Sequence, residues 1–378
     1  MKILFVAQNI DHHKVPFVQE LIRRFGEKNV CYATPIRIEQ KRIKMGFPVY
    51  ENSSWLLEIT SSTQKKFEVL FDKADIVLCN IRDYYQLMEK RLKQNKVTFY
   101  FSERWFKAGL GKARLLHPRI MNIVYHFHKL SSYPSFFYLA QGQYAADDFK
   151  FIRLCPGRIL NFGYFTSVEK NYSQNKTLPS DKINILWCGR MMKCKRVDIL
   201  IKAFSNIYKI KPQVHLTIVG EGEEQKSIDK LIKKLLPAKS ITRLNLLPSQ
   251  QVRELMNQAD IYVFPSNGFE GWGAVVNEAM SESCVIVGSN KAGAIRTMIE
   301  HNKNGLVFPS GNSKELEKQL LYLIDNQSER ERLQLAAYES ITTEWSPQNV
   351  CDRFLQISYA ILNNSSTQIY NSGAMKLL

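Results

Sequence analysis

Short apolar runs alternate with longer amphipathic segments along this chain, and the series occurs twice, on either side of a polar stretch at residues 166–182. Runs such as Lys2–Ala7 and Ile183–Cys188 are apolar along almost their whole length, which is typical of parallel strands buried on both faces. The segments between such runs have apolar residues at helical spacing. Two consecutive βα series predict two doubly wound α/β domains, and the 378 residues exceed what one hydrophobic core usually serves.

The polar stretch sets the predicted boundaries. We expect an N-terminal domain at residues 1–165, an interdomain linker at 166–182 and a second domain at 183–346, because the linker is rich in Gly, Ser, Asn and Pro. Residues 347–363 predict a final helix that packs back toward the N-terminal domain. The polar residues 364–378 predict a frayed tail.

One segment, VFPSNGFEGWGAVVNEAM at residues 263–280, combines an apolar run, a turn, a glycine-flanked loop and a helix. Gly271 and Gly273 allow the backbone to approach a ligand closely, and the free N–H groups at a helix start favour a diphosphate. Glu270 and Glu278 are about 80° apart in helical projection, so both can border one cleft. Two glutamates alone would indicate only a capping charge and a solvated helix position. The surrounding loop favours a ligand site.

A second motif, CGRMMKCKRVD at residues 188–198, ends a predicted strand and begins a predicted helix. Arg190 and Lys195 give this junction two positive charges, which suit an anionic ligand. The alternative, a merely basic helix start, is less favourable because a positive charge there opposes the helix dipole.

Residues 183–325 resemble the donor domain of the GT4 family of retaining glycosyltransferases (glycosyl transferases group 1). Three weaker motifs, VGEGE at 219–223, DIYVFPS at 260–266 and NGLVFP at 304–309, follow in the family's order. The resemblance implies the GT-B fold, with two Rossmann-like domains facing each other across a cleft. Two departures stand out: residues 293–297 lack the family's Pro-Glu pair, which puts a donor contact there in doubt, and Arg196 replaces a frequent glycine.

The resemblance implies a nucleotide-sugar site and a sugar transfer with retention of configuration. Glu270 would orient the donor sugar and Glu278 the ribose, with a UDP- or GDP-linked sugar as co-substrate. No Asp-x-Asp sequence occurs, so we expect a hexosyltransferase without a metal ion or other cofactor. The predicted donor-binding residues are Gly189, Arg190, Lys195, Phe269, Glu270, Gly271, Trp272, Gly273, Ala274, Val275 and Glu278.

The N-terminal half resembles the family mainly in its architecture. The loop after its first strand carries His12 and His13 where the family has glycines, and Glu103 follows a strand where many relatives have a histidine. Glu270, Glu103 and His12 are therefore the catalytic candidates. His12, His13, Arg104 and Lys107 are the acceptor-binding candidates. The alternatives remain surface positions for the histidines and an ion pair with Arg104 or Lys107 for Glu103.

The charge of the chain, +17, is concentrated in its first half, and no acidic residue occurs between Arg104 and Ala146. Basic and aromatic residues alternate there, which predicts contact with an anionic membrane surface or a phosphate-bearing acceptor; a solvated basic face is the alternative. No nucleic-acid module accompanies the charge, so no nucleic acid is expected as a partner. We expect a glycan or lipid-linked acceptor, in cell-surface polysaccharide biosynthesis.

Seven cysteines without framework spacing predict reduced thiols, and no apolar run approaches the roughly 20 residues needed to span a bilayer. These features predict a cytoplasmic protein, peripheral on the inner face of the plasma membrane. Two other functions fit parts of the sequence. A GT-B-like sugar phosphorylase or nucleotide-sugar epimerase would share the fold, and a non-catalytic lipid- or nucleic-acid-binding protein would need only the basic surface.

Overall fold

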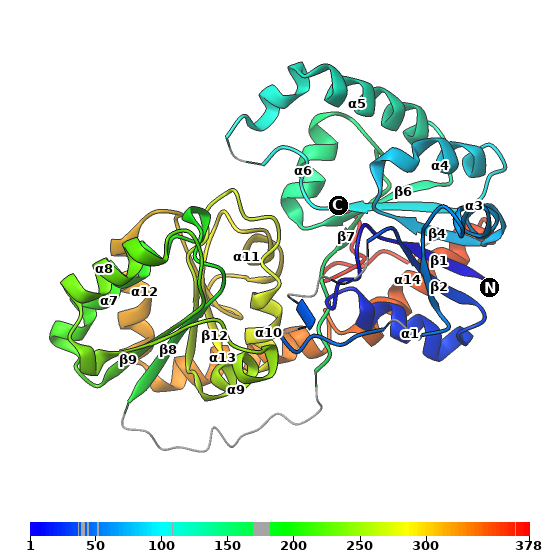
Figure 1. Cartoon of the computed structure of the whole chain (residues 1–378). Coiled ribbons are helices and arrows are strands. Elements are labelled where there is room, and N and C mark those ends of the chain that lie inside the picture. Colours follow the sequence, from blue (N-terminus) through cyan, green and yellow to red (C-terminus); the bar gives the residue numbers. More distant parts are fainter. Residues whose placement is uncertain are drawn as a thin grey trace. The chain divides into compact units, whose positions relative to one another are not determined.

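The computed structural model describes residues 1–36, 38, 42–43, 45–50, 53–107, 109–168, 182–366 and 368–378. The chain forms two compact units (Figure 1). The N-terminal unit comprises Met1–Ile43, Phe47–Ser167 and Glu344–Leu378, and the C-terminal unit comprises Lys44–Gly46 and Val168–Thr343. Most of the predicted linker, residues 169–181, lies outside the described residues.

The N-terminal unit contains a seven-stranded parallel sheet in the order β3-β2-β1-β4-β5-β6-β7. Its strands are β1 (Ile3–Val6), β2 (Val30–Thr34), β3 (Leu56–Glu58), β4 (Ile76–Cys79), β5 (Thr98–Ser102), β6 (Phe136–Gln141) and β7 (Ile159–Phe162). In the central register, Ile3 lies opposite both Val30 and Ile76. The strand order reverses between β1 and β4, so the loops that follow these two strands run to opposite sides and leave a crevice at the carboxyl edge.

Helices surround this sheet because each has one apolar face. They are α1 (Val15–Phe25), α3 (Gln64–Lys73), α4 (Tyr85–Leu92), α5 (Pro118–Ser131), α6 (Gln143–Phe151) and α14 (Pro347–Leu362), with 3₁₀ turns η1 (Arg82–Tyr84) and η2 (Gly111–Leu116). The last helix, α14, lies beside α1 (Figure 1). The ring of Phe354 lies 5.5 Å from that of Phe17 and 5.2 Å from that of Phe99, so α14 contributes to the core of the N-terminal unit.

The expectation of a frayed tail was wrong. Met375 donates its N–H to the Asn161 carbonyl at 2.6 Å, and Leu377 forms an antiparallel bridge with Leu160 of β7. β7 is the last strand of its sheet, and its unpaired backbone groups find partners in the tail. The side chains of Ala374 and Met375 are fully buried. This burial outweighs the polar composition of the neighbouring residues.

The C-terminal unit contains a six-stranded parallel sheet in the order β10-β9-β8-β11-β12-β13. Its strands are β8 (Ile183–Cys188), β9 (Val214–Val219), β10 (Ile241–Leu244), β11 (Ile261–Phe264), β12 (Val285–Ser289) and β13 (Leu306–Phe308). Its helices are α7 (Val197–Ile210), α8 (Gln225–Leu235), α9 (Ser249–Gln258), α10 (Val275–Ser281), α11 (Gly293–Met298), α12 (Ser313–Asp325) and α13 (Gln327–Thr342), with 3₁₀ turns η3 (Lys193–Lys195) and η4 (Ala238–Ser240). Here the strand order reverses between β8 and β11.

The predicted α/β class, with two doubly wound Rossmann-like halves, is confirmed. Among the described residues, no helix has the length and apolarity needed to cross a membrane.

Candidate functional site

The two predicted donor motifs follow β8 and β11, the neighbouring strands at which the order of the C-terminal sheet reverses. Ligands of open α/β sheets bind beyond the carboxyl ends of the strands at such a reversal. The backbone N–H of Asn267 donates to the carbonyl of Cys194 at 2.9 Å, which joins the loop after β11 to the loop after β8. The fold therefore brings both motifs to one place.

Lys195 and Glu270 form an ion pair across these two loops, from the Lys195 Nζ to the Glu270 Oε2. Their side chains are 17% and 14% exposed, so the pair is partly shielded from water. The ammonium also lies 5.4 Å from the centroid of the Phe264 ring, at the end of β11. Two residues from separate motifs thus converge at the sheet edge, a cation suited to a phosphate and a carboxylate suited to sugar hydroxyls.

The other charged donor candidates border the same edge. Arg190 directly follows Gly189 at the end of β8; its side chain is exposed, and its Nε lies 3.0 Å from the sulfur of Met192. Burial raises the pKa of the Cys188 thiol to about 12, and the negative charge of Glu278 acts in the same direction. The Glu278 carboxylate on α10 therefore lies near the end of β8. No comparison tests the donor-binding roles of these residues, which stay predictions.

Trp272 was predicted to bind the donor, but its indole is buried and its Nε1–H donates to the Asn277 Oδ1 at 2.8 Å. Because its side chain is held in the core in this way, Trp272 can offer a ligand only its backbone groups. By contrast, Phe269 in the same loop is exposed. Gly271, Ala274 and Val275 complete the predicted loop and the start of α10.

Close backbone packing explains two glycines around this loop. Gly273 has φ +95°, and a Cβ there would lie 2.4 Å from a carbon of the Phe264 ring. At Gly293, which begins α11, a Cβ would lie 2.1 Å from the Gly271 carbonyl oxygen. The loop after β11 is therefore packed against α11, the helix formed where this chain departs from the family's Pro-Glu pattern.

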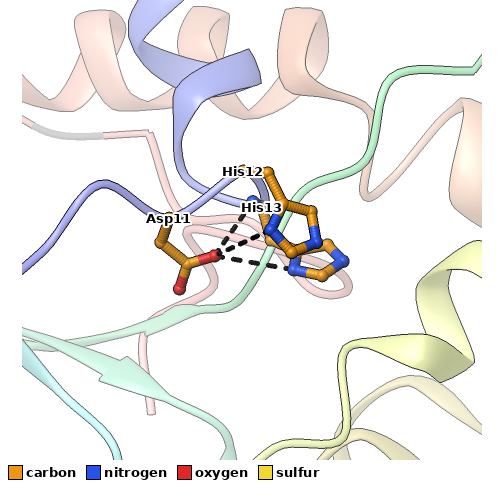
Figure 2. Close-up of side chains that lie close together, drawn as sticks. All are labelled: Asp11, His12 and His13. Carbon is orange, nitrogen blue, oxygen red and sulfur yellow. Dashed lines mark hydrogen bonds and ion pairs between the residues drawn. The ribbon is translucent and has the colours of Figure 1, made fainter. Parts of the chain in front are cut away.

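In the N-terminal unit, the loop after β1 brings Asp11, His12 and His13 together (Figure 2). The Asp11 Oδ1 accepts a hydrogen bond from the His13 backbone N–H at 3.0 Å and lies 3.6 Å from the His13 Nδ1 and 4.0 Å from the His12 Nδ1. The Lys14 Nζ lies 3.5 Å from the other oxygen, Oδ2. The sequence indicated the two histidines, but it gave no sign that the partly buried carboxylate of Asp11 holds them.

Asp11 is ionised in this cluster. Burial alone would raise the pKa of its carboxyl, but the Lys14 charge, the hydrogen bond from His13 and the histidine charges together lower that pKa below its ordinary value. The ligand atoms of Asp11, His12 and His13 lie within 4.8 Å of one another and could hold a cation. However, the Lys14 ammonium already neutralises the carboxylate and would repel a dication. The arrangement suits an internal ion cluster better than a metal site.

Glu103 is engaged through both carboxylate oxygens. Its Oε2 pairs with the Lys107 Nζ at 3.1 Å, and its Oε1 accepts a hydrogen bond from the Tyr164 hydroxyl at 3.1 Å. Burial and the Glu103 charge raise the pKa of Tyr164 well above its ordinary value, so the phenol remains a donor. Of the two ion pairs considered for Glu103, the structure contains the one with Lys107. The ring of His13 meets that of Tyr164 edge-on, 6.1 Å between centroids, which connects the β1 loop to Glu103.

Arg104 is held by its neighbours. Its Nη2 lies 3.9 Å from the Asp148 Oδ1, and its guanidinium stacks 4.8 Å from the Tyr144 ring centroid. These contacts give Arg104 a structural role whether or not it also contacts an acceptor. The catalytic and acceptor roles of His12, His13, Glu103, Arg104 and Lys107 stay predictions.

Comparisons with known proteins agree with this geometry. Residues 168–340 match the family Glycosyl transferases group 1. An uncharacterized glycosyltransferase of Haemophilus influenzae is 32% identical over 186 residues, covering 45% of this chain and 52% of the relative. A GDP-mannose-dependent monoacylated alpha-(1-6)-phosphatidylinositol monomannoside mannosyltransferase of Corynebacterium glutamicum is 25% identical over 199 residues, covering 51% of each chain. The chain spans about half the length of these two relatives.

Two solved structures are similar over nearly the whole chain. The HepE protein of Anabaena in complex with UDP has a TM-score of 0.70 at 16% identity, with 94% of this chain and 98% of the other covered. A glycosyltransferase of Rickettsia africae has a TM-score of 0.71 at 16% identity, with 96% and 99% covered. At this identity the likeness concerns the fold. The C-terminal unit thus matches the Glycosyl transferases group 1 family over almost its whole length, and the chain has the GT-B fold.

Proposed function

We propose that this protein is a metal-independent GT4 hexosyltransferase, which moves a sugar from a nucleoside diphosphate to an acceptor hydroxyl with retention of anomeric configuration. The observation that carries the proposal is the convergence of Lys195 and Glu270 at the strand reversal of the C-terminal sheet. The names of the relatives are in keeping with it. They include a GDP-mannose-dependent mannosyltransferase and a capsular polysaccharide biosynthesis glycosyltransferase of Staphylococcus aureus.

The proposed chemistry breaks the bond between the anomeric carbon and the diphosphate oxygen. The departing nucleoside diphosphate takes the electron pair and gains negative charge, which Arg190 and Lys195 would stabilise. The acceptor oxygen forms the new bond to the anomeric carbon, and its proton passes to the departing diphosphate oxygen. Glu270 would leave its pair with Lys195 to accept hydrogen bonds from sugar hydroxyls, and Lys195 would take the diphosphate as its new anionic partner.

Side-chain cations replace a divalent ion in this proposal. A diphosphate bound by Arg190 and Lys195 already has two positive charges beside it, and the sequence contains no Asp-x-Asp pair. We therefore expect turnover to persist in excess EDTA. Loss of turnover in EDTA that added Mg²⁺ or Mn²⁺ restores would contradict this part of the proposal.

The acceptor is proposed to be a glycan or a lipid-linked molecule, used in cell-surface polysaccharide biosynthesis at the inner face of the plasma membrane. The support is a surface formed by η2 and the start of α5, here called the η2–α5 surface. It exposes Leu110, Leu116, Met121 and Tyr125 to between 57% and 82%. It also lies in the acid-free part of the sequence, among Lys112, Arg114 and Arg119. Apolar side chains among cations suit a bilayer containing anionic lipid.

Flotation with vesicles tests the membrane part. We expect binding to vesicles of phosphatidylglycerol and phosphatidylcholine that decreases with salt, and weaker binding of the Leu116→Ser/Met121→Ser variant. A matched control is Ile210→Ser, which changes an exposed apolar side chain in the C-terminal unit. A protein that remains entirely unbound at low salt would contradict membrane docking.

A turnover assay tests the transfer itself. The protein is incubated with a panel of UDP- and GDP-sugars and a membrane extract, and nucleoside diphosphate release and the anomeric configuration of the product are followed by NMR. We expect release with one donor, retention in the product, and loss of both in Glu270→Ala. Formation of a sugar phosphate from inorganic phosphate, or of an epimerised donor, would instead support a phosphorylase or an epimerase.

A further inference from the structure

A basic cavity lies at the carboxyl edge of the N-terminal sheet. It consists of two adjoining hollows of about 450 and 480 Å³, which share Asn80, Arg82, Ile120 and Ile123 as lining residues. Asn80 and Arg82 follow β4, and Gln8, which lines the second hollow, follows β1. β1 and β4 are the strands at which the order of this sheet reverses, the position where open α/β sheets bind their ligands. Volumes of this size are typical of small-molecule sites.

Part of the charge around this cavity is already compensated. Glu103 pairs with Lys107 and accepts from Tyr164, and Arg104 pairs with Asp148. Glu103, Lys107 and Arg104 line the cavity but are paired, so they add no unpaired charge to it. The remaining charged lining residues are Arg82, Arg114, Arg119 and Asp83.

The three remaining arginines are positioned without acidic partners. The Arg82 guanidinium stacks 5.8 Å from the ring centroid of Trp105, and the Arg114 Nη1 donates to the Trp105 carbonyl at 3.2 Å. Arg119 lies in the first turn of α5. Within the described part of the chain, none of the three has a carboxylate within ion-pair distance. With Asp83 they leave a surplus of two positive charges, which matches a dianion.

Asn80 adds a neutral donor with a defined orientation. Its Oδ1 accepts the Gln8 backbone N–H at 2.9 Å, and no described residue accepts a hydrogen bond from its Nδ2, which can donate to a ligand oxygen. Guanidinium and amide donors around a surplus of two positive charges are the arrangement that recognises a phosphate group. An uncharged sugar would leave this surplus of positive charge uncompensated.

We propose that the basic cavity binds a phosphate or diphosphate group of the acceptor, held by Arg82, Arg119 and Asn80. The identification of the ligand as an acceptor rests on the proposed function; the phosphate chemistry rests on the cavity. Two sources have this chemistry, a phosphate that anchors the acceptor to a carrier lipid and a water-soluble phosphosugar. The η2–α5 surface beside the cavity favours the carrier lipid, because Arg114 and Arg119 belong to both.

Calorimetric titration with inorganic pyrophosphate tests the cavity. The wild-type protein should bind two equivalents, one in the basic cavity and one at the donor motifs. Arg190→Gln/Lys195→Gln should retain the cavity equivalent. Arg82→Gln/Arg119→Gln should retain the donor equivalent while weakening the other by at least about 100-fold, as expected for two lost charge-assisted hydrogen bonds. Lys65→Gln, an exposed charge on α3 outside the cavity, should behave as wild type.

Arg82→Lys/Arg119→Lys keeps the charge and should restore binding to within about 10-fold, which separates charge recognition from misfolding. If folded Arg82→Gln/Arg119→Gln binds two equivalents with wild-type affinity, the inference is wrong. If Arg190→Gln/Lys195→Gln binds two equivalents with wild-type affinity, the proposed donor site is wrong, but the phosphate site in the basic cavity is not contradicted.

Two further ligands identify the source of the phosphate. They are phosphatidylcholine vesicles that contain polyprenyl phosphate, and soluble glucose 1-phosphate. Vesicle binding that requires Arg82 and Arg119 identifies a lipid-linked acceptor, whereas glucose 1-phosphate binding with the same requirement identifies a soluble phosphosugar. The inference would be overturned if neither ligand binds and if pyrophosphate binding does not depend on Arg82 and Arg119.

Discussion

The ion pair between Lys195 and Glu270 makes a prediction that separates its role in the fold from its role in binding. Without ligand, each side chain is the other's partner. In the proposed complex, Lys195 contacts the diphosphate and Glu270 contacts the sugar, so each is needed separately. Replacing either residue by glutamine should therefore lower both the free energy of unfolding and the donor affinity. Replacing both should restore the free energy of unfolding but not the donor affinity.

The structure sets the magnitudes. Opposite charges 4 Å apart attract by about 4 kcal/mol at an effective dielectric constant of about 20, and desolvation offsets most of this. With both side chains less than one fifth exposed, we expect each single variant to lose about 1 kcal/mol of unfolding free energy. The double variant should be nearly as stable as wild type, because neither amide leaves a charge unpaired; the resulting coupling of about 2 kcal/mol lies in the range of contacting residues.

Donor binding should not recover in the double variant. Each single variant loses a hydrogen bond to a charged group, worth about 1.5–3 kcal/mol, or about 10- to 150-fold in Kd, and the double variant should lose more than either. Urea unfolding measures the first pattern, and calorimetric titration with the donor found in the panel measures the second. Wild-type affinity in either single variant, or restored affinity in the double variant, would refute the reasoning.

Three further substitutions test the packing around both sites. Gly273→Ala places a Cβ at a φ of +95° against an aromatic ring and should cost about 2 kcal/mol of unfolding free energy together with donor affinity, measured by urea unfolding and calorimetry. Arg91 is fully buried and donates to the carbonyls at positions 71, 74 and 97. Arg91→Met should therefore lose more than about 4 kcal/mol of unfolding free energy, whereas Lys90→Met, at an exposed neighbour, should change the urea midpoint little. Asp11→Asn leaves Lys14, 6% exposed, without its carboxylate and should lose about 3 kcal/mol at pH 7. Because the folded pKa of Asp11 lies below its unfolded value of about 3.9, that stabilisation is present above pH 4 and declines at lower pH, so the difference between wild type and Asp11→Asn in denaturant titrations should shrink toward pH 2.

Long apolar runs and helices with a wide apolar face could be predicted from the sequence, because their periodicity reflects burial directly. β8, β11 and α7 lie within a few residues of the predicted positions. Short or mostly polar elements could not. β3 has three residues, α11 has six, and α3 buries only Phe67 and Phe71, so each carries too little periodic signal.

The candidate site was predictable in its residue types but not in its contacts. Lys195 and Glu270 were identified on separate motifs, 75 residues apart, and only the sheet order brings them together. Trp272 was predicted to bind the donor together with its loop, but the burial of a single aromatic ring cannot be read from a loop sequence. Arg82 and Asn80 were missed, although their position directly after a buried strand was a usable signal.

Equilibrium binding of nucleoside diphosphates tests the central claim most directly. UDP, GDP and their sugars are titrated calorimetrically into the wild-type protein, into Lys195→Gln, and into Lys209→Gln, which removes an exposed lysine at the opposite end of α7. The account predicts that one nucleoside diphosphate binds wild type and Lys209→Gln equally, and binds Lys195→Gln at least about 10-fold more weakly. Binding of none of these ligands to the wild-type protein, or equal binding to all three proteins, would contradict it.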